Sequence, residues 1–105
     1  MSGIQAADPL PLHPGKILLT RDFFLTSRLS IAEICRRLGI SRQALYNILE
    51  AKNGVSPIMA LKLARLCGTA PEFWLDCQAR YDLAVAAQRY AAEIEAVPPF
   101  QIGAP

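Results

Sequence analysis

Two short stretches of helical pattern, joined through Gly39, constrain the fold of this chain more than any other feature. Ser30 followed three residues later by Glu33 is a capping-box pattern, in which each side chain accepts a backbone N–H that the helix start leaves unbonded. It predicts a helix from about Ile31 to Leu38. Gly39 then supplies the left-handed conformation that ends helices, and Ser41 is placed to cap the next one. Only a few residues therefore separate the two helices.

The helix after this turn, from about Arg42 to Ala51, is expected to be half-buried because its apolar and polar side chains lie on opposite faces. The apolar face carries Ala44, Leu45, Ile48 and Leu49, and the polar face carries Arg42, Gln43, Tyr46, Asn47 and Glu50. Two helices that cross at a steep angle need a small side chain at their contact, and Cys35 provides one. This arrangement is the sequence form of a helix-turn-helix, which we place at residues 30–51.

The polar face of the second helix has the residue types that reach base edges in DNA. Arginine can donate two hydrogen bonds to guanine, and glutamine or asparagine can pair with adenine. The stretch from Arg28 to Lys52 holds five basic side chains against two acidic ones, although the net charge of the whole chain is only +2. The alternative is a helical hairpin with a merely solvated face, but such a face tends toward lysine and glutamate. We therefore predict DNA binding.

The side chains expected to contact DNA fall into two groups. Those predicted to read bases lie on the second helix of the motif: Ser41, Arg42, Gln43, Tyr46 and Asn47. Those predicted to hold phosphates lie on the first helix, after the second, and at the start of the next: Arg36, Arg37, Lys52, Asn53 and Ser56. Loss of a base contact should alter sequence preference, whereas loss of a phosphate contact should weaken binding to all sequences.

The segments around the motif predict an all-α, five-helix bundle in a single domain of residues 1–105. Residues 1–13 hold Pro9 and Pro11 and are expected to form an extended arm, followed by a helix from about Pro14 to Thr26. Ser56-Pro57 is a strong start signal for a fourth helix, which should run to about Cys67. No segment shows the sustained apolar and polar alternation of a strand.

The fifth expected helix, residues 70–95, has apolar side chains on two sides. Thr69 with Glu72 repeats the capping-box pattern at its start, and two prolines follow its end. One stripe can face the core: Trp74, Cys77, Tyr81 and Val85. A second series lies on another side: Leu75, Ala79, Leu83, Ala86, Tyr90 and Ile94. We predict that the second series is a homodimer interface. The alternative is that the end of this helix folds back on its own domain.

Neither metal binding, catalysis nor membrane insertion is favoured. Cys35, Cys67 and Cys77 form no CxxC pair, and each falls where a helical stripe would bury a small residue. The sole histidine, His13, has no nucleophile or carboxylate nearby in sequence, and no GxSxG, HExxH or phosphate-binding glycine loop is present. The start of the chain lacks a signal-peptide pattern, and no apolar run approaches the ~20 residues that span a membrane. We expect a cytoplasmic protein without cofactor or metal that is not an enzyme.

Four blocks of the chain together resemble one family: HPGKILL at residues 13–19, LGISRQALYNIL at 38–49, GVSPIMALKLARLCGTAPEFWL at 54–75 and QARYDL at 78–83. In this order and spacing they are similar to the HigA group of XRE-type helix-turn-helix antitoxins. The resemblance implies a lambda-repressor-like fold of five helices and a homodimer that represses its own operon through an inverted repeat in double-stranded DNA. It also implies a second partner, a small basic RelE-like toxin that is a ribosome-dependent mRNase.

The resemblance carries over unevenly to the residues expected to read bases. Ser41, Arg42 and Gln43 stand in the SRQ block of that family, whereas Tyr46 and Asn47 occupy positions where the family often has smaller or basic residues. The turn at residues 50–52 also differs from the pattern of that family. The operator sequence is therefore not determined by the resemblance. An alternative function also stays open, since a transcriptional regulator without a toxin partner would need the same fold.

Overall fold

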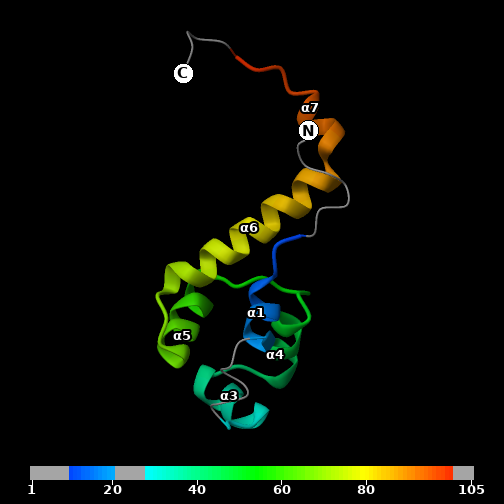
Figure 1. The fold of residues 1–105 in the computed structure, drawn as a ribbon. Coiled ribbons are helices and arrows are strands. Elements are labelled where there is room, and N and C mark those ends of the chain that lie inside the picture. The colour runs from blue at the N-terminus through cyan, green and yellow to red at the C-terminus, as the bar shows by residue number, and fades with distance from the viewer. Residues whose placement is uncertain (1–9, 21–27, 101–105) are drawn as a thin grey trace.

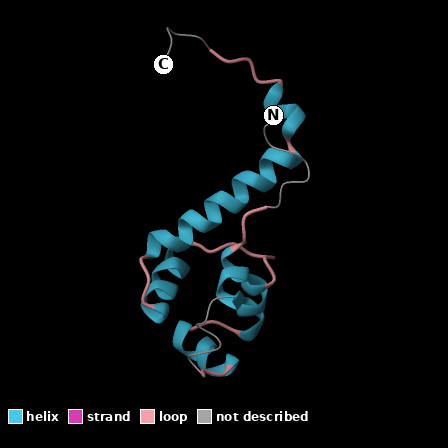
Figure 2. Ribbon diagram, viewed as in Figure 1, coloured by secondary structure: helices cyan, strands magenta, loops and turns pink. Residues whose placement is uncertain are grey.

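The computed structural model describes residues 10–20 and 28–100, and all regular structure within these ranges is helical (Figure 2). The helices are α1 (Pro14–Thr20), α3 (Ile31–Leu38), α4 (Arg42–Leu49), α5 (Pro57–Cys67), α6 (Pro71–Arg89) and α7 (Ala91–Glu95) (Figure 1). The all-α prediction is confirmed over these residues. The first expected helix is confirmed as far as Thr20, and its remainder, like residues 1–9 of the expected arm, lies outside the described residues.

Three helices start as expected, because a serine hydroxyl accepts a backbone N–H at each N-terminus. Ser30, Ser41 and Ser56 accept from the N–H three residues further on, at 3.1, 3.0 and 3.2 Å. Gly39 and Gly68 end α3 and α5 with φ of 70° and 74°, the left-handed region that glycine enters without steric cost. The local signals of the sequence therefore set these bounds.

The capping box expected at Thr69 and Glu72 is wrong. The N-cap of α6 is Ala70, which makes no side-chain capping bond, and Pro71 follows at the first helical position. The Thr69 hydroxyl instead accepts the indole N–H of Trp74 at 2.7 Å. A buried indole N–H needs an acceptor, whereas a helix that begins with proline has one fewer N–H to satisfy.

Two helix ends also differ from expectation. Helix α4 ends at Leu49 rather than Ala51, because Ala51 takes a positive φ of 62° and the chain turns back. The expected fifth helix is divided at Tyr90, whose φ of −113° and ψ of 26° separate α6 from α7. The described residues consequently form six helices where five were expected.

The core lies between α1, α3, α4, α5 and the first turns of α6. Its buried apolar side chains are Leu18, Ile34, Cys35, Leu38, Leu45, Ile48, Leu49, Val55, Ala60, Leu63 and Trp74. Cys35 lies at the α3–α4 contact as predicted, and its thiol donates to the Ser41 carbonyl at 3.7 Å. Cys67 and Cys77, in contrast, are only half-buried, which corrects the expectation that every cysteine is a core residue.

Helix α1 packs directly against the end of α4, and Gly15 makes this approach possible. A Cβ atom at Gly15 would lie only 1.8 Å from the carbonyl oxygen of Ile48. Any larger residue would therefore push the two helices apart. This contact fixes α1 beside the second helix of the motif.

Helix α6 begins against α5 and then runs away from the body of the molecule, ending in α7 at the far end from α3 (Figure 1). Every residue from 87 to 100 is exposed. The alternative that the end of this helix folds back on its own domain is therefore wrong. The last three residues of α6, 87–89, and all of α7 are thus exposed.

Candidate nucleic-acid interface

Helices α3 and α4 form the expected helix-turn-helix. The turn is closed by two backbone bonds, from the Gly39 N–H to the Arg36 carbonyl at 3.3 Å and from the Ile40 N–H to the Cys35 carbonyl at 3.0 Å. The aliphatic face of α4 is buried against α3 and α1, with Leu45, Ile48 and Leu49 each at most 6% exposed. The opposite face of α4 is thereby held outward.

The residues predicted to read bases share that outward face. Ser41, Arg42 and Gln43 are exposed at the N-terminus of α4, and Tyr46 is 40% exposed one turn further along. Asn47 is half-buried, and its side-chain oxygen accepts a hydrogen bond from Gln43 Nε2 at 2.9 Å. The helix thus presents a continuous polar surface in which two amides are already paired.

The two arginines predicted to hold phosphates project from α3, where both are bound to Glu33. Arg36 makes a two-pronged ion pair with Glu33, and Arg37 Nε lies 2.9 Å from Glu33 Oε2. Hydrogen bonds from Arg36 first, and then from Arg37, lower the pKa of the Glu33 carboxyl to about 2. The same pairing raises the pKa of Arg36. In the DNA-free protein, one carboxylate therefore orders both cations.

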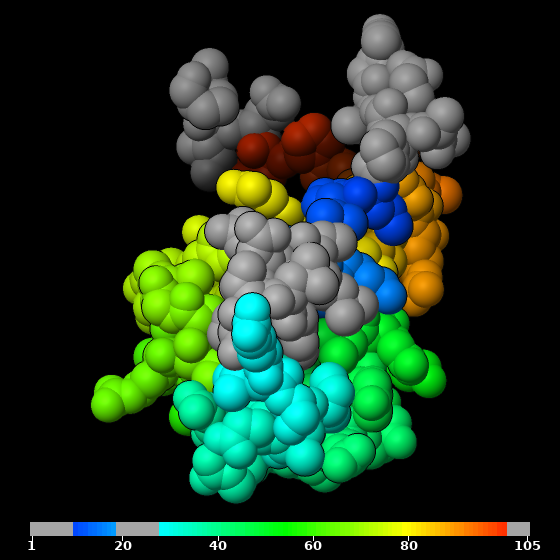
Figure 3. All heavy atoms as spheres, turned by 60° about the horizontal axis from the view of Figure 1, so that its bottom comes forward, coloured from blue at the N-terminus to red at the C-terminus, as the bar shows by residue number. Residues whose placement is uncertain are grey.

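Sequence reasoning assigned Glu33 only a capping role, and the structure gives it a second one. Glutamate three and four residues before arginine on a helix is the spacing at which side chains meet, so this signal was present in the sequence. Figure 3 shows α3, in cyan, exposed on this face of the molecule, with the end of α4 and the loop after it in green beside it.

The remaining residues predicted to hold phosphates lie in the loop between α4 and α5. Lys52 and Asn53 are exposed, and both of their backbone N–H groups turn back to the Asn47 carbonyl, at 2.8 and 3.0 Å. Lys52 Nζ pairs with Glu50 at 3.1 Å, and Ser56 caps α5. All three residues therefore lie in the short segment that joins α4 to α5.

This loop is held from behind by Gln78 of α6, a residue to which sequence reasoning gave no role. Gln78 is 9% exposed, its Oε1 accepts the Val55 N–H at 2.8 Å, and its Nε2 donates to Asp82 at 3.0 Å. Gln78 lies four residues after Trp74, so it falls on the stripe expected to face the core. A polar side chain on a buried stripe is the signal that could have identified it.

His13 is a structural residue that joins three parts of the fold. It is 2% exposed, its Nδ1 accepts the Gly15 N–H at 2.9 Å, and its ring meets that of Tyr81 edge to face at 5.0 Å. Burial lowers the pKa of His13, partly offset by the Asp82 carboxylate and a backbone hydrogen bond with Asn53. Within the described ranges, no group of three or more His, Cys, Asp or Glu side chains could hold a metal ion.

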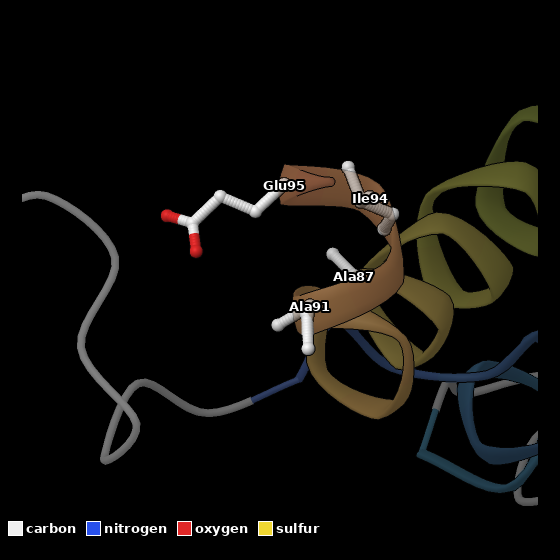
Figure 4. Close-up of a pocket in the computed structure, with 5 residues that line it drawn as sticks. Ala87, Ala91, Ile94 and Glu95 are labelled. Atoms are coloured by element: carbon white, nitrogen blue, oxygen red, sulfur yellow. The ribbon is translucent and has the colours of Figure 1, made fainter. Parts of the chain in front are cut away.

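The second apolar series of the C-terminal helix is mostly exposed to solvent. Leu83, Ile94 and Tyr90 are 71%, 53% and 44% exposed, whereas Leu75 differs because it packs against the core. Near the end of α6, a shallow open groove is lined by Ala87, Ala91, Ala92, Ile94 and Glu95. Figure 4 shows Ala87, Ala91 and Ile94 around the bend between the helices, with the Glu95 carboxylate pointing away.

The crossing of α3 and α4, with its outward polar face, defines a helix-turn-helix DNA-binding protein. Residues 27–74 match the helix-turn-helix family. Virulence-associated protein A′ of Dichelobacter nodosus is 36% identical over 80% of this chain and 72% of its own length. The solved antitoxin GraA is 38% identical, with a TM-score of 0.80 over 89% of this chain and 100% of its own. The chain belongs to the HigA-type antitoxin family.

A second solved relative connects this fold directly with DNA. The Pseudomonas aeruginosa antitoxin HigA, solved with the higBA promoter, is 32% identical, with a TM-score of 0.77 over 86% of this chain and 98% of its own. DNA binding and transcription regulation are therefore properties of the family to which this chain belongs. Among the described helices, none is long and apolar enough to cross a membrane.

Proposed function

We propose that this chain is a sequence-specific DNA-binding antitoxin that represses its own operon as a homodimer and neutralises a small basic RelE-like mRNase toxin. The observation that carries the proposal is the outward polar face of α4. This face is positioned by the packing of α4 against α3 and α1 and by the loop that follows α4. The similarity of the chain to an antitoxin solved with promoter DNA supports the binding of this face to an operator. On this proposal the chain is not an enzyme and needs no cofactor.

In the proposed complex, the N-terminus of α4 enters the major groove. Ser41, Arg42 and Gln43 meet base edges first, with Tyr46 and Asn47 one turn further along. Phosphates are held by α3, by the loop after α4 and by the start of α5, through Arg36, Arg37, Lys52, Asn53 and Ser56. In the structure both arginines are paired with Glu33 on α3, and on this proposal they exchange that carboxylate for DNA phosphates.

The proposed homodimer uses the exposed side of α6 and α7. Ala79, Leu83, Ala86, Tyr90 and Ile94 form this surface, and Leu75 is left out because it already packs against the core. Burying an exposed leucine is worth about 1.5–3 kcal/mol when it is complete, which favours covering Leu83 with a second copy. A two-fold protein also suits an inverted repeat, whose half-sites lie one DNA turn, ~34 Å, apart.

The toxin half of the proposal rests on relatives that are named antitoxins. Another relative is named for virulence rather than for an antitoxin role, so a transcriptional regulator without a toxin partner is the second candidate function. The test is to express the small open reading frame adjacent to this gene, alone and together with this chain, in a bacterial host. Growth arrest by the neighbour, its relief by co-expression and co-purification of the two support the antitoxin. A harmless neighbour that does not bind supports the regulator.

A further inference from the structure

Gln43 and Asn47, one turn apart on α4, are joined through their side-chain amides. Gln43 Nε2 donates to Asn47 Oδ1 at 2.9 Å. Gln43 is exposed, whereas Asn47 is half-buried. A glutamine on a surface normally retains considerable rotamer freedom, which it must lose when it binds a partner. A bond to a more enclosed neighbour restricts that freedom before DNA arrives, so the two side chains behave as one unit.

Asn47 is itself held in place by the backbone around it. Its carbonyl accepts the N–H groups of Lys52 and Asn53, at 2.8 and 3.0 Å, where the chain turns after α4. Its side-chain oxygen is occupied by Gln43. The backbone of Asn47 is therefore fixed near the end of the helix, while Gln43 extends from the exposed first turn.

The bond determines which way the Gln43 amide faces. Because Nε2 is the atom that bonds to Asn47, Oε1 lies on the other side of the amide. One N–H of Nε2 and the acceptor capacity of Oε1 remain for another partner. Gln43 thus offers a donor and an acceptor next to each other.

Adenine is the base whose major-groove edge matches this pair. It presents the acceptor N7 beside the donor N6 amino group, whereas guanine presents two acceptors, N7 and O6. Guanine would therefore place O6 against Gln43 Oε1, an acceptor against an acceptor. Thymine and cytosine each present a single polar group there, so neither would satisfy both atoms of the amide.

We propose that Gln43 reads an adenine in each half-site and that Asn47 is a positioning residue, which holds the Gln43 amide in the orientation that adenine requires. This inference rests on the proposed function, since it needs α4 in the major groove. It deepens that function by assigning a base to one residue, and it replaces the direct base contact proposed above for Asn47 with an indirect role. A good bidentate contact predicts a preference of roughly 5- to 150-fold for adenine at that base pair.

The test is selection of binding sites from a library of random DNA duplexes, carried out with the full chain and with three variants. In Gln43→Ala the reading amide is absent. Asn47→Ala removes the support, and Asn47→Asp keeps an oxygen that can accept from Gln43 but removes every side-chain donor. Thermal unfolding of each variant checks that the fold is intact. The readout is the relative preference for adenine at each base pair of the selected motif, which a uniform change in affinity does not alter.

We expect Gln43→Ala and Asn47→Ala to lose the same adenine, with the rest of the motif retained, and Asn47→Asp to keep it although its charge weakens binding to every sequence. The inference is overturned if Asn47→Ala alters a different base pair or none, because Asn47 then reads its own base or does not contribute. It is also overturned if Asn47→Asp behaves like Asn47→Ala, or if Gln43→Ala keeps the adenine. If the wild-type chain enriches no motif at all, the proposed function fails and this inference fails with it.

Discussion

Gln78 Oε1 accepts the backbone N–H of Val55 at 2.8 Å, which ties the middle of α6 to the loop that follows α4. The same amide donates to Asp82 at 3.0 Å, so both of its ends are bonded. The loop carries Lys52 and Asn53, two of the residues proposed to hold phosphates. One buried side chain thus positions part of the proposed DNA-binding surface from the helix that is proposed to dimerise.

Replacing Gln78 by leucine should destabilise the protein, because the Val55 N–H would be left without its acceptor. An unsatisfied buried donor costs about 1–3 kcal/mol. The matched control is Gln88→Leu, at an exposed position of the same helix, which should change the free energy of unfolding little. Urea denaturation of both variants measures the difference. Equal stability of the two would show that the Gln78 bond is not needed to hold the loop.

The stability of the protein should fall as the pH drops below about 6.5, the ordinary pKa of histidine. Burial lowers the pKa of His13, so the folded state binds fewer protons than the unfolded state in this range. The contribution of neutral, buried His13 to the free energy of unfolding is therefore complete above pH 6.5. It is lost as the pH falls from there toward the lowered pKa of His13.

His13→Asn is the variant that isolates this effect, because asparagine keeps an acceptor for the Gly15 N–H but does not titrate. It should be less stable than the wild type at pH 8, since the ring contact with Tyr81 is lost, and its stability should change less between pH 7 and 5. Denaturation across this range measures the slope. If the unfolding free energy of the variant and of the wild type changed equally with pH, His13 would not be the cause of the pH dependence.

A second pH effect should arise from Glu33 at lower pH. Hydrogen bonds from Arg36 and Arg37 lower the pKa of Glu33 from 4.5 to about 2 in the folded state. The stabilisation by these ion pairs is thus present above pH 4.5 and is lost as the pH falls toward 2. Glu33→Gln should show a shallower loss of unfolding free energy across this window. The double variant Arg36→Ala/Arg37→Ala should reproduce that shallower loss. If the pH dependence of the unfolding free energy changed in Glu33→Gln but not in the double variant, the ion pairs would not be its cause.

Charge placed on the open side of α6 should dissociate the proposed homodimer. Leu83→Asp puts a carboxylate where a second copy is proposed to bury an apolar side chain, and an unpaired buried charge is strongly unfavourable. Leu61→Asp is the control, because Leu61 is also exposed, at 56%, but lies on α5 outside this surface. Sedimentation equilibrium at micromolar concentration should give a monomer for Leu83→Asp and a dimer for Leu61→Asp. A wild-type monomer would remove the dimer from the account.

Much of the fold follows from signals that act over three or four residues. The capping serines Ser30, Ser41 and Ser56 and the glycine at position 39 determine helix ends through bonds within one turn, so their roles could be read from spacing. Thr69 has the same local pattern, but its hydroxyl is taken by the Trp74 indole. A local pattern cannot show that a buried side chain nearby has the greater need for an acceptor.

Of the roles that sequence reasoning missed, the ion pairs of Glu33 are local, whereas the role of Gln78 depends on a contact between distant segments. Gln78 and Val55 are 23 residues apart, and nothing in either neighbourhood indicates that they meet. Leu75 was assigned to the dimer surface because helical periodicity identifies a face without showing what covers it. The structure places Leu75 against its own core, which leaves Leu83 as the most exposed apolar residue of the proposed interface.

We propose that α4 reads the base sequence of DNA while α3 holds its phosphate backbone. Affinity should be measured for a duplex from the promoter of this gene and for a random duplex, at several salt concentrations, with Arg42→Ala and Arg37→Ala beside the wild type. Arg42→Ala should lose about 1–3 kcal/mol on the promoter duplex and little on the random one. Arg37→Ala should weaken both duplexes alike and reduce the salt slope by roughly 1. Equal losses on both duplexes for the two variants would contradict the claim.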